Sequence, residues 1–267
     1  MATPDDRPRT VQHRDLLTRA MQVLTALVDL DDEAYGVRPL SEILDLPASS
    51  VHRVLSRLEE LGLVSRHPDG GFQLGVEFYR LAWRATDRFS LTRAAGDPLK
   101  EMAEACNEAA FLGVYSPERR QMMFAASVDS EHPVKYVLEL GRWLPLVGAS
   151  GMAILAHLPE AEMRAVLDAD TAEPPQYRPD VETELRNVRE RGYAISAGAR
   201  IPGAVGIAAP IIGKDDQVLG DIGITMPEQR FEPEAEEFYA TLVMRTAAAV
   251  SSMVGAPAGA IRSRQRA

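Results

Sequence analysis

The chain has 267 residues, of which 46% are apolar and 25% are charged, and its formal net charge is −10. This length favours two domains over one, and the apolar share is enough for a packed core in each. The sequence has no apolar run of about 18 residues, no signal-peptide core near its start and one cysteine, Cys106. We therefore expect a soluble cytoplasmic protein without a membrane helix or a disulfide framework.

The first part of the chain shows the spacing of a small helix-turn-helix unit. Apolar residues recur at helical intervals over 15–28, which predicts a first helix there. A short second helix is predicted over 39–44 and, after a turn, a third over 48–61. The third helix has one apolar stripe, formed by Val51, Val54, Leu55, Leu58 and Leu61.

The polar side chains of the third helix are suited to contacts with DNA. They lie off the apolar stripe and near the helix start: Ser49, Ser50, His52, Arg53 and Arg57. Arginine can bond guanine through two hydrogen bonds, and serine reaches phosphates or base edges in the major groove. Two alternatives stay open here, because the arginines can form a solvated face and His52 can pack at the edge of the stripe.

A short hairpin is predicted after the third helix. Strand-like residues 63–66 and 72–74 flank a glycine-containing turn, and Arg66 is a candidate phosphate contact. Helix, short helix, longer helix and hairpin, in this order, predict a winged helix-turn-helix over 14–75 with double-stranded DNA as its partner.

The charge of this region complicates the DNA prediction. The first 80 residues hold nine Arg and no Lys against thirteen Asp plus Glu, a net charge of −4. A domain-wide basic surface is therefore missing, so positive charge must be local to the third helix and the hairpin. We expect modest nonspecific affinity, because phosphate neutralisation supplies most of that affinity. A ligand-binding sensor whose winged helix contacts only proteins is the second interpretation.

A connecting helix is predicted over 76–92, within a linker segment that extends over 76–96. One of its faces carries three arginines at helical spacing: Arg80, Arg84 and Arg88. That face is either solvated or in contact with the DNA backbone or a partner protomer. The second domain is expected over 97–254, with Asp97 and Pro98 as the cap and first residue of a helix.

The second domain mixes strands with helices. Strands are predicted over 109–115, 121–128, 134–140, 205–212 and 218–226, the last two as a hairpin. Helices are predicted over 148–156, 160–167, 180–192 and 234–254. This order indicates an α+β fold in which helices pack on a mixed antiparallel sheet. Residues 1–13 and 255–267 are expected to be a flexible arm and a disordered tail.

One stretch of the second domain can hold an anion. Gly148-Ala149-Ser150-Gly151 opens a helix, so its backbone N–H groups and the positive end of the helix dipole favour a carboxylate. Ser150 and Thr225 can add hydroxyl donors, and Phe111 and Ile207 can supply apolar walls. The alternatives are that the glycines only permit a tight turn and that Ile207 belongs to the core.

Recognised catalytic motifs are absent from the sequence. It contains no nucleophile elbow, zinc-protease helix, P-loop or dinucleotide-binding fingerprint, and its five histidines lack metal-ligand spacing. Cys106 is interpreted as a buried structural cysteine. Glu131-His132 is interpreted as a loop, with an acid–base pair or a metal ligand as the alternative. We expect no enzyme, cofactor or metal site, and a small-molecule hydrolase is the weaker alternative.

Several short segments, in a fixed order, resemble the IclR family of bacterial transcription regulators. The segments are Ser50-Val51-His52-Arg53-Val54-Leu55, Leu61-Gly62-Leu63-Val64, Leu144-Pro145-Leu146, Arg191-Gly192-Tyr193-Ala194 and Gly206-Ile207-Ala208-Ala209-Pro210. The resemblance covers residues 12–250. It implies a winged helix, a linker helix and a C-terminal effector domain of GAF-like or profilin-like type. It also implies homodimers or homotetramers that bind DNA and respond to a small-molecule effector.

Two departures from the family pattern bear on the candidate sites. Segment 40–47 is shorter than the family's usual second helix, which can tilt the third helix. The positions that match the family's polar pocket are Ser196, Gly206, Gly223 and Thr225, so most of its polar side chains are missing. The resemblance therefore implies an effector larger or more apolar than glyoxylate or pyruvate, and we expect an organic or aromatic acid.

Overall fold

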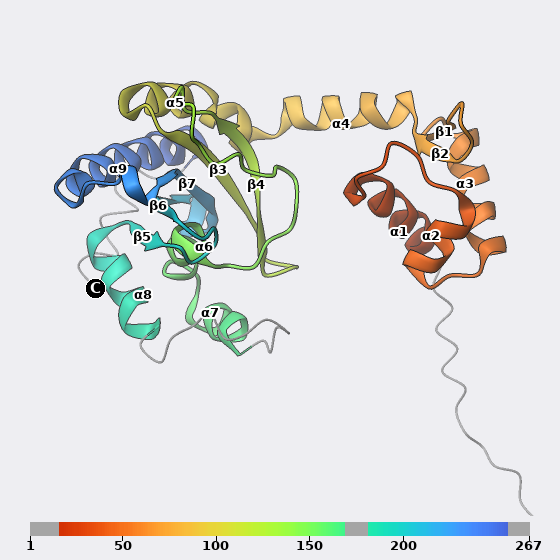
Figure 1. The fold of residues 1–267 in the computed structure, drawn as a ribbon. Helices are drawn as coiled ribbons and strands as arrows, with labels where there is room; N and C mark the ends of the chain where they lie inside the picture. Colours follow the sequence, from red (N-terminus) through yellow and green to blue (C-terminus); the bar gives the residue numbers. More distant parts are fainter. Residues whose placement is uncertain (1–15, 169–180, 256–267) are drawn as a thin grey trace, which may run out of the picture. The chain divides into compact units, whose positions relative to one another are not determined.

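The computed structural model describes residues 16–168 and 181–255 and divides the chain into two units that join between Arg88 and Phe89 (Figure 1). Each unit is described by itself. The predicted arm over 1–13, the cap at Asp180 and the tail beyond residue 255 lie outside the described residues.

The first unit has the predicted order of helices and hairpin. Its elements are α1 (Leu16–Asp29), α2 (Val37–Leu44), α3 (Ala48–Glu60), β1 (Val64–Arg66), β2 (Phe72–Leu74) and α4 (Val76–Arg88). The apolar faces of α1, α2 and α3 meet in one core, which includes the fully buried Val23, Leu40 and Leu55. The side chain of Phe72 in the hairpin is also buried in this core. The Phe72 backbone pairs with that of Tyr35, which holds the hairpin against the helices. The unit is thus a winged helix-turn-helix, as predicted.

The connecting helix ends earlier than predicted. It stops at Arg88, where Phe89 takes an extended conformation, and α5 (Ser90–Cys106) then begins. The prediction that Asp97 and Pro98 start a helix is wrong, because Pro98 lies inside α5. An interior proline costs about 3 kcal/mol, and burial of the apolar face of α5 offsets this cost. That face consists of Leu91, Ala95, Leu99, Met102 and Ala103.

The second unit is built on one antiparallel sheet of five strands in the order β4-β3-β7-β6-β5. The strands are β3 (Ala109–Ser116), β4 (Gln121–Val128), β5 (Ala194–Ala197), β6 (Ala204–Ile212) and β7 (Val218–Pro227). The predicted hairpin is β6 and β7, paired from Ala204↔Pro227 to Ile212↔Val218. β5 is an edge strand that the sequence analysis did not predict.

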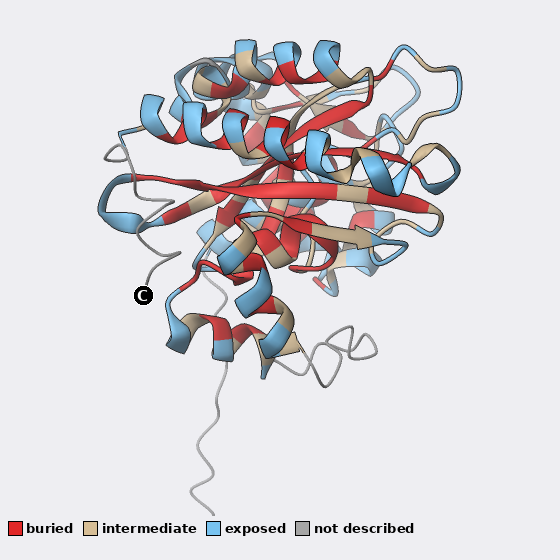
Figure 2. Cartoon of the chain, turned by 90° about the vertical axis from the view of Figure 1, so that its left-hand side faces the viewer, coloured by how far each residue is buried: buried red, intermediate tan, exposed pale blue. Residues whose placement is uncertain are grey.

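Helices cover both faces of the sheet. Besides α5, the second unit has the α-helices α6 (Gly148–Leu155), α7 (Glu160–Leu167), α8 (Val181–Arg191) and α9 (Glu236–Met253). α5 and α9 pack on one face, and α6 packs on the other, beside α8. The strands are buried along much of their length, α5, α7, α8 and α9 each turn a buried side inward and an exposed side to solvent, and α6 is buried almost throughout (Figure 2). The α+β prediction is confirmed.

The predicted strand over 134–140 is wrong. This segment is a loop that contacts the sheet through the isolated bridge between Leu140 and Phe124 and through the buried side chain of Leu138. Val134 and Val137 are exposed, so the β-branched residues that suggested a strand do not face the core. The Tyr136 hydroxyl instead donates to the backbone of Pro202 at 3.1 Å, which ties the loop to the segment after β5.

Candidate functional site

The first candidate site is the exposed side of α3. Ser49, His52 and Arg53 are exposed on it, opposite the buried stripe, as predicted. Arg53 makes no ion pair among the residues that the structure describes. Ser50 is half-buried, and its hydroxyl accepts a long hydrogen bond from Arg19 of α1 at 3.4 Å. Arg53 is therefore an exposed arginine of α3 that no acidic neighbour holds within the described part of the chain.

The two other candidate arginines are held by acidic neighbours. Arg57 pairs with Glu60 at 2.6 Å, and both side chains are exposed. Arg66 lies 3.4 Å from Glu59 and stacks over the Phe72 ring, with its guanidinium carbon 3.8 Å from the ring centroid. Exposed ion pairs contribute at most about 1 kcal/mol, so a phosphate can replace Glu60 or Glu59 at little cost.

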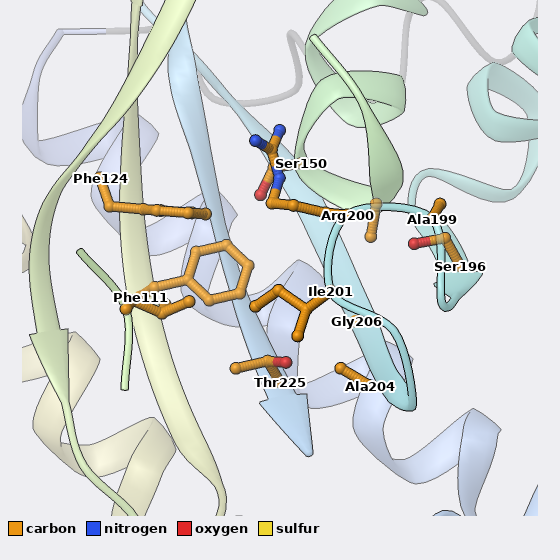
Figure 3. A pocket seen from close by; sticks show the side chains of 12 residues that line it. Phe111, Phe124, Ser150, Ser196, Ala199, Arg200, Ile201, Ala204, Gly206 and Thr225 are labelled. Carbon is orange, nitrogen blue, oxygen red and sulfur yellow. The ribbon is translucent and has the colours of Figure 1, made fainter. Parts of the chain in front are cut away.

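The second candidate site is a pocket in the second unit; the space at this pocket, open solvent included, is about 370 Å³. Six predicted effector residues line it: Phe111, Ala149, Ser150, Ser196, Gly206 and Thr225. They come from β3, α6, β5, β6 and β7, so the pocket lies between the start of α6 and the sheet (Figure 3). Phe111 and Phe124 meet edge to face, with ring centroids 5.0 Å apart, and form its aromatic wall.

Sequence reasoning missed half of the lining residues. These are Phe124, Leu138, Ala199, Arg200, Ile201 and Ala204. Arg200 matters most, because it brings a guanidinium to the pocket. It donates to the carbonyls of Pro145 at 3.0 Å and Val147 at 2.7 Å, which lie just before α6. The Arg200 side chain extends along the pocket toward Ser150 (Figure 3). Arg200 lies in a loop after a strand that was not predicted, so no sequence pattern pointed to it.

The structure contradicts Ile207 as a pocket wall. Ile207 is fully buried in the core on the opposite face of the sheet, beneath α5 and α9. Side chains alternate between the two faces of a strand, so Gly206 and Ile207 cannot face the same pocket. The alternative interpretation of Ile207 as plain core is therefore the correct one.

The glycines near the pocket have distinct roles. Gly148 has φ +69°, and a Cβ there would lie 3.3 Å from the Cβ of Arg200, so this glycine borders the pocket wall. A Cβ on Gly151 would collide with the backbone of Leu146, which supports the tight-turn interpretation for that residue. A Cβ on Gly223 would lie 2.6 Å from the Phe111 ring, so this glycine lets the ring lie across β7.

One buried acid lies next to the pocket. Asp221 on β7 is fully buried, and burial raises the pKa of its carboxyl group to about 7, although the Ser150 hydroxyl and the Arg200 charge act in the opposite direction. Among the residues that the structure describes, neither carboxylate oxygen of Asp221 has a hydrogen-bond partner, because the contact with Ser150 does not reach normal hydrogen-bond geometry. No sequence pattern indicated Asp221, because it stands alone among apolar residues of a strand.

Cys106 and His132, which the sequence analysis considered for chemistry, lie outside the pocket and form contacts within the second unit. Cys106 is half-buried, and its thiol donates to the Met102 carbonyl at 3.1 Å. His132 lies 4.0 Å from Glu108, whose buried carboxylate receives two hydrogen bonds of 2.5 Å from Arg230. Within residues 16–168 and 181–255, no three His, Cys, Asp or Glu side chains gather in a way that could hold a metal ion.

A winged helix-turn-helix joined to a sheet domain with a pocket between a helix start and the sheet defines a class of two-unit DNA-binding regulators. Family models described as bacterial transcriptional regulator IclR C-terminal and IclR helix-turn-helix domain match residues 83–252 and 16–68. The chain belongs to the IclR family and is a DNA-binding transcriptional regulator, as the resemblance implied. In the part of the chain that the structure describes, no helix is long and apolar enough to cross a membrane.

Known proteins similar to this chain match along most of its length. The glycerol operon regulatory protein of Streptomyces griseus is 30% identical over 249 residues, which cover 90% of this chain and 96% of the relative. The IclR transcriptional regulator of Alicyclobacillus acidocaldarius has the same fold, with a TM-score of 0.79, 24% identity and coverage of 90% and 98%. An IclR homologue of Microbacterium hydrocarbonoxydans, solved with 4-hydroxybenzoate, has a TM-score of 0.75, 22% identity and coverage of 90% and 99%.

Proposed function

We propose that a small organic acid, with an aromatic acid as the leading candidate, binds in the pocket of the second unit and modulates operator binding. The composition of the pocket wall carries this proposal. It combines the polar side chains of Arg200, Ser150 and Thr225 with the rings of Phe111 and Phe124. A guanidinium beside ring-lined walls matches a carboxylate on an apolar body. The Microbacterium hydrocarbonoxydans structure, which contains 4-hydroxybenzoate, supports the same ligand class.

A calorimetric titration tests the ligand class directly. We expect 4-hydroxybenzoate to bind and its neutral amide to bind much more weakly, because the amide lacks the charge that Arg200 recognises. Arg200→Gln should lower the affinity for the acid by roughly tenfold to a hundredfold, since a hydrogen bond to a charged group contributes about 1.5–3 kcal/mol. Arg186→Gln is the matched control, because Arg186 is exposed on α8 and donates a hydrogen bond to Thr183 of the same helix. Equal binding of acid and amide would contradict the proposal.

The operator-contacting surface is proposed to be α3 together with the hairpin. It comprises Ser49, Ser50, His52, Arg53, Arg57 and Arg66. The exposure of Arg53 near the start of α3 supports a contact with a base edge, whereas Arg57 and Arg66 suit phosphates. Phosphates would position the protein, and base-edge contacts would select the sequence.

Fluorescence anisotropy with DNA from the region upstream of the protein's own gene tests operator recognition. The titration is run at two salt concentrations and against scrambled DNA of equal length. Selective binding that weakens with salt is expected, because phosphate contacts release counterions. Binding that is equal for both DNAs would contradict a role as a sequence-specific regulator at that site. Addition of saturating 4-hydroxybenzoate then shows whether the ligand binds one DNA-binding state more tightly than another.

A second copy of this chain is the proposed partner of the first unit, in a homodimer or homotetramer in the cytoplasm. None of the α4 side chains that the structure describes is buried, and Trp83 is 77% exposed. Exposed apolar side chains at helical spacing line α4 and the outer face of α1: Val76, Tyr79 and Trp83, and Leu17, Met21 and Val28. Exposed apolar side chains gathered on one helix face typically mark a protein interface.

A further inference from the structure

Asp221 is a buried carboxyl group beside the charged end of the pocket. It lies on β7, on the same sheet face as Thr225, and none of its surface is exposed. Gly113 faces it across the β3–β7 pair, and a Cβ on Gly113 would collide with the Asp221 carboxylate. The absence of a side chain on β3 therefore provides the space that the carboxyl group fills.

Two residues of the pocket wall also act on Asp221. The Ser150 hydroxyl and the Arg200 guanidinium both favour the charged form of Asp221, yet burial outweighs them and raises its pKa to about 7. Ser150 and Arg200 line the pocket as well. Asp221 thus shares these two residues with any ligand that binds at this end of the pocket.

The remaining surroundings of Asp221 are apolar or hold their own partners. Gly113 of β3 and Pro210 of β6 lie opposite it in the sheet. Tyr115, two residues beyond Gly113 on the same face, donates to Glu162 of α7 at 2.6 Å. Within the described residues, Arg200 is the charged side chain whose field acts on Asp221. The charge balance at this end of the pocket is therefore set by Asp221, Arg200 and the ligand.

We infer that Asp221 determines which ligand charge the pocket accepts: an organic acid binds as its carboxylate together with one proton, and that proton resides on Asp221. The inference rests on the proposed acid-binding function of the pocket. In the empty pocket, ionised Asp221 is balanced by Arg200. A ligand carboxylate adds a second negative charge, which one guanidinium cannot balance in a buried site. A proton from solvent then forms an O–H bond on Asp221, and Arg200 balances the ligand.

This arrangement makes the affinity for acids depend on pH. Above the pKa of Asp221, each carboxylate ligand must bring a proton, so its affinity falls by up to tenfold per pH unit. The affinity for a neutral ligand of the same shape lacks this dependence, because its binding adds no charge. Asp221→Asn carries no titratable group and imitates the protonated form, so it should bind the acid with an affinity independent of pH.

Calorimetry of the full-length protein with 4-hydroxybenzoate tests the inference. Titrations run from about pH 6 to about pH 8.5, a range in which the ligand keeps its carboxylate and its phenol proton. Two buffers of different ionisation enthalpy at each pH give the number of protons taken up by the wild-type protein, which does not depend on any variant folding. Asp221→Asn and the exposed control Asp215→Asn are titrated in parallel. Infrared difference spectra of the ligand-free protein, wild type minus Asp221→Asn, report the Asp221 proton separately.

Each outcome decides between the inference and its alternatives. Proton uptake that approaches one per ligand, with affinity that falls with pH in wild type and Asp215→Asn but not in Asp221→Asn, would support it. Acid binding without proton uptake and with flat affinity would overturn it and leave the acid-binding function intact. If neither 4-hydroxybenzoate nor unsubstituted benzoate binds, the proposed ligand class fails and the inference fails with it, even when infrared spectra show Asp221 titrating near neutrality.

Discussion

Replacement of Asp221 by asparagine should stabilise the second unit at neutral and alkaline pH. The two side chains have nearly the same size, so the packing against Gly113 is retained and only the ionisation is lost. Burial raises the pKa of Asp221 from the ordinary value of 3.8 to about 7 in the folded chain. The folded state therefore holds the proton more tightly than the unfolded state.

The sign and size of the effect follow from this difference. As pH rises from about 4 to about 7, the unfolded chain loses the Asp221 proton first, so the wild-type free energy of unfolding decreases across that range and is constant above it. About three pKa units, at about 1.4 kcal/mol each, give an upper limit of about 4 kcal/mol. We expect Asp221→Asn to be more stable than wild type by about 2–4 kcal/mol at pH 8 and nearly equal to it at pH 4.

Hydrogen exchange measured by mass spectrometry on the full chain is the suitable assay, because it reports the second unit separately from the first. Peptides from β7 and β3 should exchange more slowly in Asp221→Asn than in wild type at pH 8, and the difference should vanish near pH 4. Asp215→Asn, in the exposed turn before β7, should change stability by less than about 0.5 kcal/mol. A variant less stable than wild type at pH 8 would show that Asp221 is stabilised in its ionised form and would refute the reasoning.

Three further predictions concern the rest of the molecule. Arg53→Ala should weaken operator binding by about 1–3 kcal/mol in the anisotropy assay if Arg53 bonds a base, and an unchanged affinity would remove that role. If the proposed oligomer forms through α4, Trp83→Ala should shift it toward monomer in analytical ultracentrifugation, because a large exposed ring is lost from α4; an unchanged distribution would exclude α4 as the interface. Glu108→Ala should destabilise the second unit to urea by about 3 kcal/mol, because Arg230 loses its buried partner; a loss below 1 kcal/mol would show that the pair is weak.

The local patterns of the first unit were sufficient to predict its elements. The third helix was predicted over 48–61 and is observed over Ala48–Glu60, because its apolar stripe has the helical period and Gly62 has the positive φ that ends a helix. The hairpin followed from two short apolar strands around a glycine-containing turn. In this unit, sequence neighbours supply most of the signals that determine the fold.

The errors in the second unit arise where packing overrides local preference. Asp97-Pro98 has the composition of a helix start, yet the buried residues on both sides of it continue one helical face through α5. Segment 134–140 has strand-forming residues but lies in a loop, where a bridge at Leu140 contacts β4. β5 is four residues long and is a strand because β6 pairs with it. Such features depend on partners that lie far away in the sequence.

The pocket was predictable to the extent that its residues belong to regular elements. Strand periodicity places Gly206 and Thr225 on one face, and the same periodicity excludes Ile207, so that error could have been avoided. Arg200 could not be found in this way, because a loop has no period that indicates the direction of a side chain. Asp221 was overlooked because an isolated acid in an apolar strand forms no motif.

The position of Asp221 links its destabilising charge to the proposed regulatory role. Above a pH of about 7, Asp221 is ionised in the empty second unit, and adding the proton that accompanies an acid ligand costs free energy. At pH 8, one unit above the pKa of about 7, this cost is about 1.4 kcal/mol, which falls within the coupling free energies of about 1–3 kcal/mol that connect two binding sites in allosteric proteins. A ligand changes an equilibrium only through its different affinities for two states. A buried acid that must be protonated in one of them provides such a difference without any large movement of the pocket.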